Sequence, residues 1–310
     1  MNNLIVSPSP HLHTKTTTTG IMRDVIIALA PSAVAGVVFY GLKAAILIAV
    51  CVCTAVLSEF LFNLITKKKQ TIGDLSAIVT GLILALTLPT KTTIWHCVVG
   101  TIFAIIVVKC LFGGLGCNFA NPAATARVMM LIAFSGTVAG GGINTIVDLE
   151  AGATPLASIA AGEGNLPSLL DMFLGVRHGA IGEGCIVAIV IGFIYLVVRR
   201  VIKWETPVIY AGVVFLLSLA IKQDLTAALY QVMGGGVVFA AVFMATDYVT
   251  TPINRLGKMV FAAGCGIITV LIRFWGSYPE GASFAILLMN ILSPYIEKMC
   301  ARKALGGAKK

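Results

Sequence analysis

Apolar residues fill long stretches of this chain, and polar residues fall mainly between those stretches. Most stretches come close to the roughly 20 residues that a helix needs to cross the hydrocarbon core of a bilayer. Because open strands would leave backbone groups unsatisfied in lipid, the pattern predicts helices. We therefore expect an all-α integral membrane protein with about ten transmembrane helices. The ten segments lie at about residues 21–41, 43–66, 74–90, 92–112, 119–135, 183–199, 206–221, 227–246, 257–274 and 279–297.

The composition agrees with this prediction. Of the 310 residues, 58% are hydrophobic and only 11% are charged, whereas a soluble domain is about one quarter charged. The formal net charge of +9 would suit a nucleic-acid-binding protein, but in a membrane protein it usually reports Lys and Arg held on the cytoplasmic face. We therefore expect no nucleic-acid partner. The first twenty residues are polar and rich in Thr, so we also expect no cleaved signal peptide.

The basic residues are distributed unevenly between the two sides that ten spans would define. Basic loops stay in the cytoplasm, so the bias predicts cytoplasmic termini and an external loop at 136–182. The five bases outside are Lys43, Lys91, Arg177, Lys222 and Arg273. The sixteen inside are Lys15, Arg23, Lys67, Lys68, Lys69, Lys109, Arg199, Arg200, Lys203, Arg255, Lys258, Lys298, Arg302, Lys303, Lys309 and Lys310.

A weak internal repeat divides the chain into two halves. Residues 81–88 resemble residues 236–243, which pairs the third segment with the eighth. Five spans per unit would invert one half relative to the other, and such folds hold their sites near the repeat interface. We expect a cytoplasmic segment at 1–20, membrane halves at 21–135 and 183–297, the external loop at 136–182, and a basic tail at 298–310. Channels, transporters and membrane redox subunits all use this plan, so the fold alone leaves a small-solute channel or transporter as an alternative.

The external loop contains a candidate residue for the covalent attachment of a group. Thr154 stands between the small residues Gly152 and Ala153 and the rigid Pro155. On spacing alone, an ordinary turn explains these residues better. In chemical terms, the exposed hydroxyl of Thr154 could accept a phosphoester, and a modifying enzyme would have room to reach it.

Four further stretches identify a family. They span residues 80–89, 109–123, 245–252 and 280–290, and the Gly-Ala-Thr motif lies between the second and the third. With these stretches in this order, the chain resembles the NqrB/RnfD family of membrane subunits of ion-translocating oxidoreductases. The likeness runs from about residue 20 to residue 300 and favours the RnfD branch, whose members belong to Rnf-type ferredoxin:NAD oxidoreductase complexes.

The resemblance implies a flavin and a set of partners. In this family the matching Thr carries FMN through a phosphoester, so Thr154 would be the acceptor. Gly152, Ala153 and the upstream Asp148 would complete the flavinylation motif, while Ala151 departs from the usual Ser. A flavin transferase would attach the FMN, and a riboflavin held noncovalently among the helices is a second expectation.

The same resemblance implies the protein's activity and place in the cell. The chain would carry electrons in an Rnf-type translocase complex that couples electron transfer between ferredoxin and NAD to sodium or proton translocation. It would not be catalytic alone, and its partners would be the membrane and peripheral subunits of that complex. The location would be the bacterial cytoplasmic membrane, with the Thr154 loop outside.

Ionisable residues within apolar segments are expensive to bury in lipid and usually face a cavity or a partner. Arg127 could hold a flavin, a carboxylate of the ion path, or carbonyls at a helix end. Asp247, at the end of the eighth segment, could cap a helix or belong to an ion path. We expect Lys109 to extend to the inner surface and Glu59 to anchor the interface. The histidines and cysteines show no metal-ligand spacing, and the Gly run at 234–236 predicts a kink or close packing.

Overall fold

The computed structural model describes residues 17–139, 155–161, 167–276 and 280–301, and all regular structure in these ranges is helical. Each of the ten apolar segments contains helix, which confirms the all-α prediction. The first half holds α1 (Thr18–Ile65), η1 (Ile72–Asp74), α2 (Ser76–Thr87), α3 (Ile94–Ile102), η2 (Phe103–Cys110), α4 (Pro122–Ala133) and α5 (Ser135–Val138). The loop and second half hold α6 (Pro155–Ala161), α7 (Leu169–Leu174), α8 (Ile186–Val198), α9 (Glu205–Lys222), α10 (Leu225–Met233), α11 (Val237–Phe239), η3 (Ala240–Met244), α12 (Arg255–Trp275) and α13 (Ala282–Met299).

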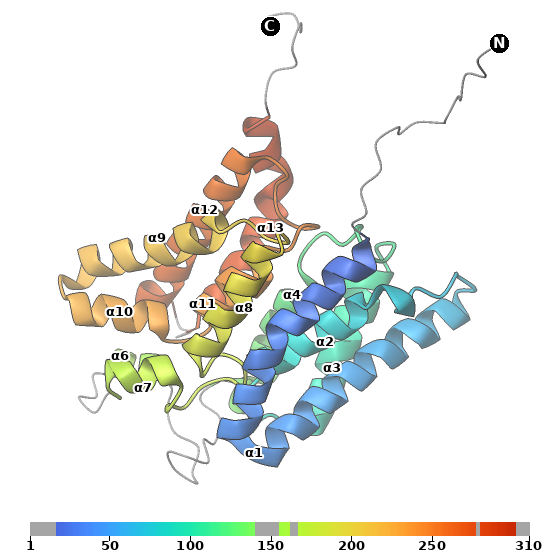
Figure 1. The fold of residues 1–310 in the computed structure, drawn as a ribbon, viewed down its shortest axis with the longest axis horizontal. Coiled ribbons are helices and arrows are strands. Elements are labelled where there is room, and N and C mark those ends of the chain that lie inside the picture. The colour runs from blue at the N-terminus through green and yellow to red at the C-terminus, as the bar shows by residue number, and fades with distance from the viewer. Residues whose placement is uncertain (1–16, 140–154, 162–166, 277–279, 302–310) are drawn as a thin grey trace, which may run out of the picture.

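The first two predicted segments form the two arms of α1. Gly41, with φ 71° and ψ −164°, interrupts the helical backbone between residues 18–40 and 42–65. A left-handed φ is open to Gly without steric cost, so Gly41 allows the chain to fold back on itself. The sharp bend lies near the bottom of Figure 1.

Helix length separates two groups of apolar helices. Three described helices, α1, α9 and α12, are long and apolar enough to cross a membrane, and α10 with α11–η3 becomes a fourth if the bent pair counts as one span. Four shorter apolar helices (Ser76–Thr87, Ile94–Cys110, Pro122–Ala133 and Ile186–Val198) pack among them. The fold is therefore that of a helical membrane protein with several short or interrupted helices.

The helix interruptions have identifiable local causes. A bend of 58° separates α10 from α11–η3, and Gly235 adopts φ 57° within it, so the kink predicted at residues 234–236 is confirmed. α4 starts at Pro122, with the Asn121 side chain accepting hydrogen bonds from the amides of Ala123 (3.0 Å) and Ala124 (3.2 Å). Pro at the first helical position and Asn as N-cap both favour a helix start.

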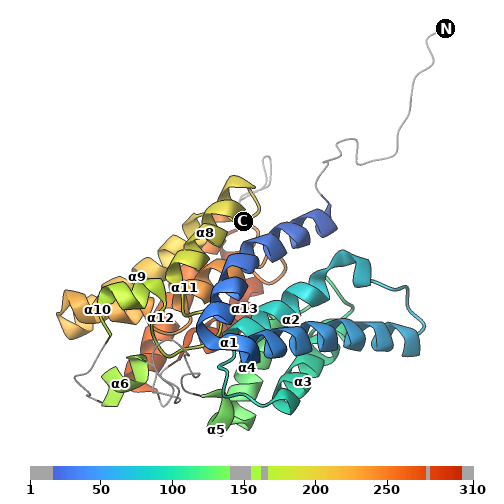
Figure 2. The same cartoon turned by 60° about the horizontal axis from the view of Figure 1, so that its bottom comes forward.

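The two halves pack along two seams. Within the first half, α1 contacts α2 and α3; within the second, α12 contacts α9 and α13. Between the halves, α1 contacts α8 and α4 contacts α13. The start of α1 and the end of α13 lie toward one end of the molecule, while α6 and α7 lie toward the other (Figures 1 and 2).

Candidate functional site

The four residues of the expected flavinylation motif, Asp148, Gly152, Ala153 and Thr154, lie outside the described residues. The description resumes at Pro155, the first residue of α6. Leu156 is buried at 4% exposure and packs against the α10–α11 break, where Cβ atoms added to Gly234 and Gly235 would lie 2.9 Å and 2.8 Å from its side chain. The chain that follows Thr154 is thus fixed to the broken eighth segment.

Arg127 contacts both a carboxylate and a carbonyl at the end of a helix. Its Nη2 donates to Glu280 Oε2 at 2.9 Å, and its Nη1 donates to the carbonyl of Val138 at 3.2 Å. Arg127 itself is only 1% exposed. The guanidinium therefore links α4 to Glu280, which precedes α13. It also links α4 to the carbonyl at the end of α5.

Two charged residues that the sequence did not single out lie at the same end. Arg177 is buried and donates to the carbonyls of Met233 (2.5 Å) and Glu183 (2.6 Å). The Glu183 carboxylate lies so close to Gly236 that a Cβ there would overlap it. Arg177 lies in the loop before α8, and Glu183 begins the seventh predicted segment but precedes the first residue of α8. The only clue in the sequence was that each residue carries a charge, which needs a partner if it is buried.

Arg273 completes the cluster at the end of α12. Its Nη1 donates to the carbonyl and the side chain of Gln231, and its Nη2 donates to the carbonyl of Gly234 at 3.1 Å. The three guanidinium groups of Arg127, Arg177 and Arg273 act electrostatically on Glu183, and Glu280 is the second carboxylate of this cluster. The excess positive charge suits an anionic group.

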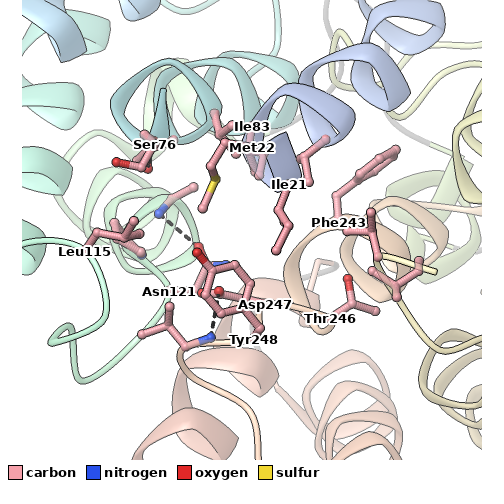
Figure 3. Close-up of a pocket in the computed structure, with 18 of the residues that line it drawn as sticks. Ile21, Met22, Ser76, Ile83, Leu115, Asn121, Phe243, Thr246, Asp247 and Tyr248 are labelled. Atoms are coloured by element: carbon pink, nitrogen blue, oxygen red, sulfur yellow. Dashed lines mark hydrogen bonds between the residues drawn. The ribbon is translucent and has the colours of Figure 1, made fainter. Parts of the chain in front are cut away.

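A second site lies at the end that holds the start of α1. The cleft encloses about 800 Å³ including its open mouth, between α1, α2 and the loop after η3. Figure 3 shows Ile21, Met22 and Ile83 on one wall, with Asp247 and Tyr248 facing them. The cleft is mainly apolar, with a few polar groups at its edge, as in most small-molecule sites.

Asp247 lies in the loop that lines this cleft. Its carboxylate accepts hydrogen bonds from the amide of Val249 (3.1 Å) and the hydroxyl of Thr250 (3.1 Å). Burial raises the pKa of this carboxyl above its ordinary value, although both hydrogen bonds oppose the shift. The side chain thus has the loop-capping role that the sequence allowed, and it is also part of the cleft wall.

The expectations for Lys109 and Glu59 were wrong. Lys109 does not extend to the surface, because it is 2% exposed and donates to both Glu59 oxygens, at 3.0 Å and 2.9 Å. Its ammonium also donates to the Ser76 hydroxyl at 2.5 Å. Glu59 is 1% exposed and accepts a further bond from Thr71 at 2.6 Å. The pair lies in the interior of the first half, and Lys109 lines the wall of the cleft.

In the described ranges, no three His, Cys, Asp or Glu side chains come close enough together to hold a metal ion. The two sites are instead a cationic cluster beside α6 and an apolar cleft at the opposite end. Both lie where segments of the two halves meet.

Comparisons with known proteins identify the family. The family model described as NQR2, RnfD, RnfE matches residues 5–306. The D subunit of the Na(+)-translocating ferredoxin:NAD(+) oxidoreductase complex of Acetobacterium woodii is 44% identical, covering 99% of this chain and 96% of the relative. The D subunit of the proton-translocating ferredoxin:NAD(+) oxidoreductase complex of Clostridium ljungdahlii is 35% identical, covering 96% of this chain and 94% of the relative. The chain therefore belongs to the NQR2, RnfD, RnfE family.

Proposed function

We propose that this chain is the electron-carrying membrane subunit of an Rnf-type complex that couples electron transfer between ferredoxin and NAD to ion translocation, with FMN bound covalently at Thr154. The family membership supports the complex, because relatives that match nearly the whole chain are named as its D subunit. The cationic cluster supports the flavin. It lies beside α6, which starts immediately after Thr154, and it offers positive charge to an anionic phosphoester.

The proposed topology has ten transmembrane helices in two inverted five-helix repeats. Its main support is that the halves meet through equivalent segments: α1 and α8 belong to the first segment of each half, and α4 and α13 to the fifth. The start of α1 and the end of α13 share one end of the molecule, opposite α6 and α7 (Figure 1). This arrangement fits cytoplasmic termini and a Thr154 loop outside the bacterial cytoplasmic membrane.

The proposal includes partners and a cation. Electrons would pass between this chain and other membrane and peripheral subunits of the complex, and a flavin transferase would install the FMN. The two relatives are named for different cations, sodium and protons, so the proposal covers either one. The flavin would supply the redox chemistry, and the protein would supply its position and its electrostatic surroundings.

A noncovalent riboflavin would fit the cleft at the opposite end. The cleft is mainly apolar with a few polar side chains in its lining, which is the character of most sites for small organic ligands. Ile21, Met22 and Ile83 would cover the isoalloxazine faces, and the Asn121 and Asp247 side chains could bond its polar edge or ribityl hydroxyls. Flavin extracted without hydrolysis from purified protein, and found at about one per chain, would support this second site; extract free of flavin would remove it.

In-gel flavin fluorescence of the denatured polypeptide tests the covalent flavin. The chain is produced with an active flavin transferase and inserted into a native-like membrane, beside Thr154→Val and the matched loop control Thr145→Val. We expect fluorescence in the wild type and in Thr145→Val, and none in Thr154→Val. A dark wild-type band, with the transferase active on another substrate in the same cells, would overturn the proposal. Solute flux in liposomes would then test the channel or transporter alternative.

A further inference from the structure

Positive charge gathers where α9 and α12 begin, at one end of the second half. Lys203 and Arg255 are exposed there, and Lys258 is half-buried. Arg255 forms an ion pair with Glu205, its Nε donating to Oε2 at 2.9 Å. Lys203 and Lys258 both act electrostatically on the same carboxylate, so the four charged groups lie together. We name Lys203, Glu205, Arg255 and Lys258 the basic patch.

The basic patch holds more positive charge than its carboxylate neutralises. Glu205 is paired with Arg255, and in the described part of the chain no salt bridge reaches Lys203 or Lys258. Arg200, three residues before Lys203, is a further exposed cation without a salt bridge in those ranges. Cations without carboxylate partners attract an anionic group from outside the chain.

Exposed apolar side chains continue from the basic patch along both helices. Trp204 and Val208 are exposed at the start of α9, and Leu256 and Val260 are exposed on α12. The members of each pair are four residues apart and therefore share a helix face. α9 and α12 pack together, and each is long and apolar enough to cross a membrane. An exposed Trp beside the cations is typical of the membrane–water interface.

These two features together select one kind of ligand, with negative charge at one end and hydrocarbon at the other. An anionic phospholipid has both: its phosphodiester pairs with Lys and Arg, and its acyl chains cover apolar helix faces. An acidic protein could neutralise the cations from the aqueous side, but it would leave the apolar face uncovered. The continuity of the cations with the apolar face therefore favours a lipid.

We propose that the basic patch binds the headgroup of an anionic phospholipid, whose acyl chains lie along Val208 of α9 and along Leu256 and Val260 of α12. The proposal does not rest on the flavin or on the cation that the complex moves, so its test is independent of the proposed function. Each Lys or Arg near a membrane surface strengthens the attraction of an anionic lipid about fivefold. Removing both lysines of the patch should weaken it roughly 25-fold.

Trp204 provides a probe at the site, because brominated acyl chains quench the fluorescence of a nearby tryptophan. The chain has three Trp residues, and replacing the exposed Trp95 and Trp275 by Phe leaves Trp204 as the only one. The full chain is reconstituted into bilayers of phosphatidylcholine and phosphatidylglycerol, with bromine on one lipid or the other. The two quenching curves give the affinity of the anionic lipid at Trp204 relative to the zwitterionic lipid.

Three paired variants in this background separate local charge from other effects. Lys203→Gln with Lys258→Gln removes both lysines of the patch. The matched control, Lys67→Gln with Lys69→Gln, removes two exposed lysines from the loop after α1, in the other half and on the same predicted side of the membrane. Lys203→Arg with Lys258→Arg keeps both charges.

We expect the unaltered patch to prefer phosphatidylglycerol. That preference should fall roughly 25-fold in the Gln pair at the patch and stay unchanged in the Arg pair and in the control pair. Circular dichroism first establishes equal helix content. If the Gln pair at the patch loses helix, Lys203→Gln alone, at an exposed position, should still lower the preference about fivefold.

Four results would overturn the lipid site. A relative affinity near one with the unaltered patch would leave the basic patch to an acidic protein surface. An equal preference in the unaltered patch and the folded Gln variant would remove the lysines from lipid binding. Equal falls in the Gln pair and the control pair would reduce the effect to overall charge. A fall in the Arg pair as large as in the Gln pair would assign the effect to packing.

Discussion

The buried pair of Lys109 and Glu59 provides a quantitative test of the packing in the first half. Removing the ammonium in Lys109→Met leaves the Glu59 carboxylate buried with only the Thr71 hydroxyl as a partner. At 2.9 Å and an effective permittivity of about 20, the lost attraction is about 6 kcal/mol. Part of it is offset because the ammonium no longer needs to be desolvated. Breaking a buried pair at one partner costs about 3–5 kcal/mol, so we expect a loss in this range.

A double-mutant cycle separates this interaction from general damage. We expect Lys109→Met and Glu59→Gln each to lower the free energy of unfolding by several kcal/mol. The double variant, which leaves no unpaired charge, should recover most of the loss and give a coupling energy of about 3 kcal/mol or more. Reversible unfolding of the protein in detergent–lipid micelles measures all four forms. Additive losses, with a coupling energy below about 0.5 kcal/mol, would contradict the pairing and the energy derived from it.

Two further predictions concern the α1–α8 seam and the cleft. A Cβ at residue 192 would overlap the carbonyl of Ala28, so Gly192→Ala should destabilise the fold by about 1–3 kcal/mol. Gly212→Ala, where the added Cβ meets nothing within 4 Å, should be neutral or stabilising by up to about 1 kcal/mol; equal thermal shifts would contradict this. Burial raises the pKa of Asp247, so its folded carboxyl favours the protonated form, and stability should fall as pH rises from the ordinary value of about 3.9 through the raised one. Asp247→Asn should flatten that slope in thermal unfolding measured across this range, and an unchanged slope would refute the assignment.

The apolar pattern predicted the helices well because burial in lipid demands long uninterrupted runs, and each run proved helical. The Gly run at 234–236 also predicted the interruption found there. Lys109 could not be interpreted correctly, since its partner Glu59 is 50 positions away and only tertiary packing brings the two together. Arg177 and Glu183 were missed for a related reason: they lie in a loop, where neither periodicity nor segment length distinguishes a buried charge from a solvated one. The fold was therefore more predictable than the electrostatics of the sites.

The close fit of the two seams limits how the halves move relative to each other. At one seam Gly192 packs directly against the backbone of Ala28, and at the other Arg127 joins α4 to Glu280 by an ion pair of 2.9 Å. Alternating access by rocking one half against the other would have to open these contacts in every cycle. Such rocking would separate a buried guanidinium from its carboxylate, at a cost of about 3–5 kcal/mol. The seams thus favour a rigid arrangement of the two halves over one that changes shape in every cycle.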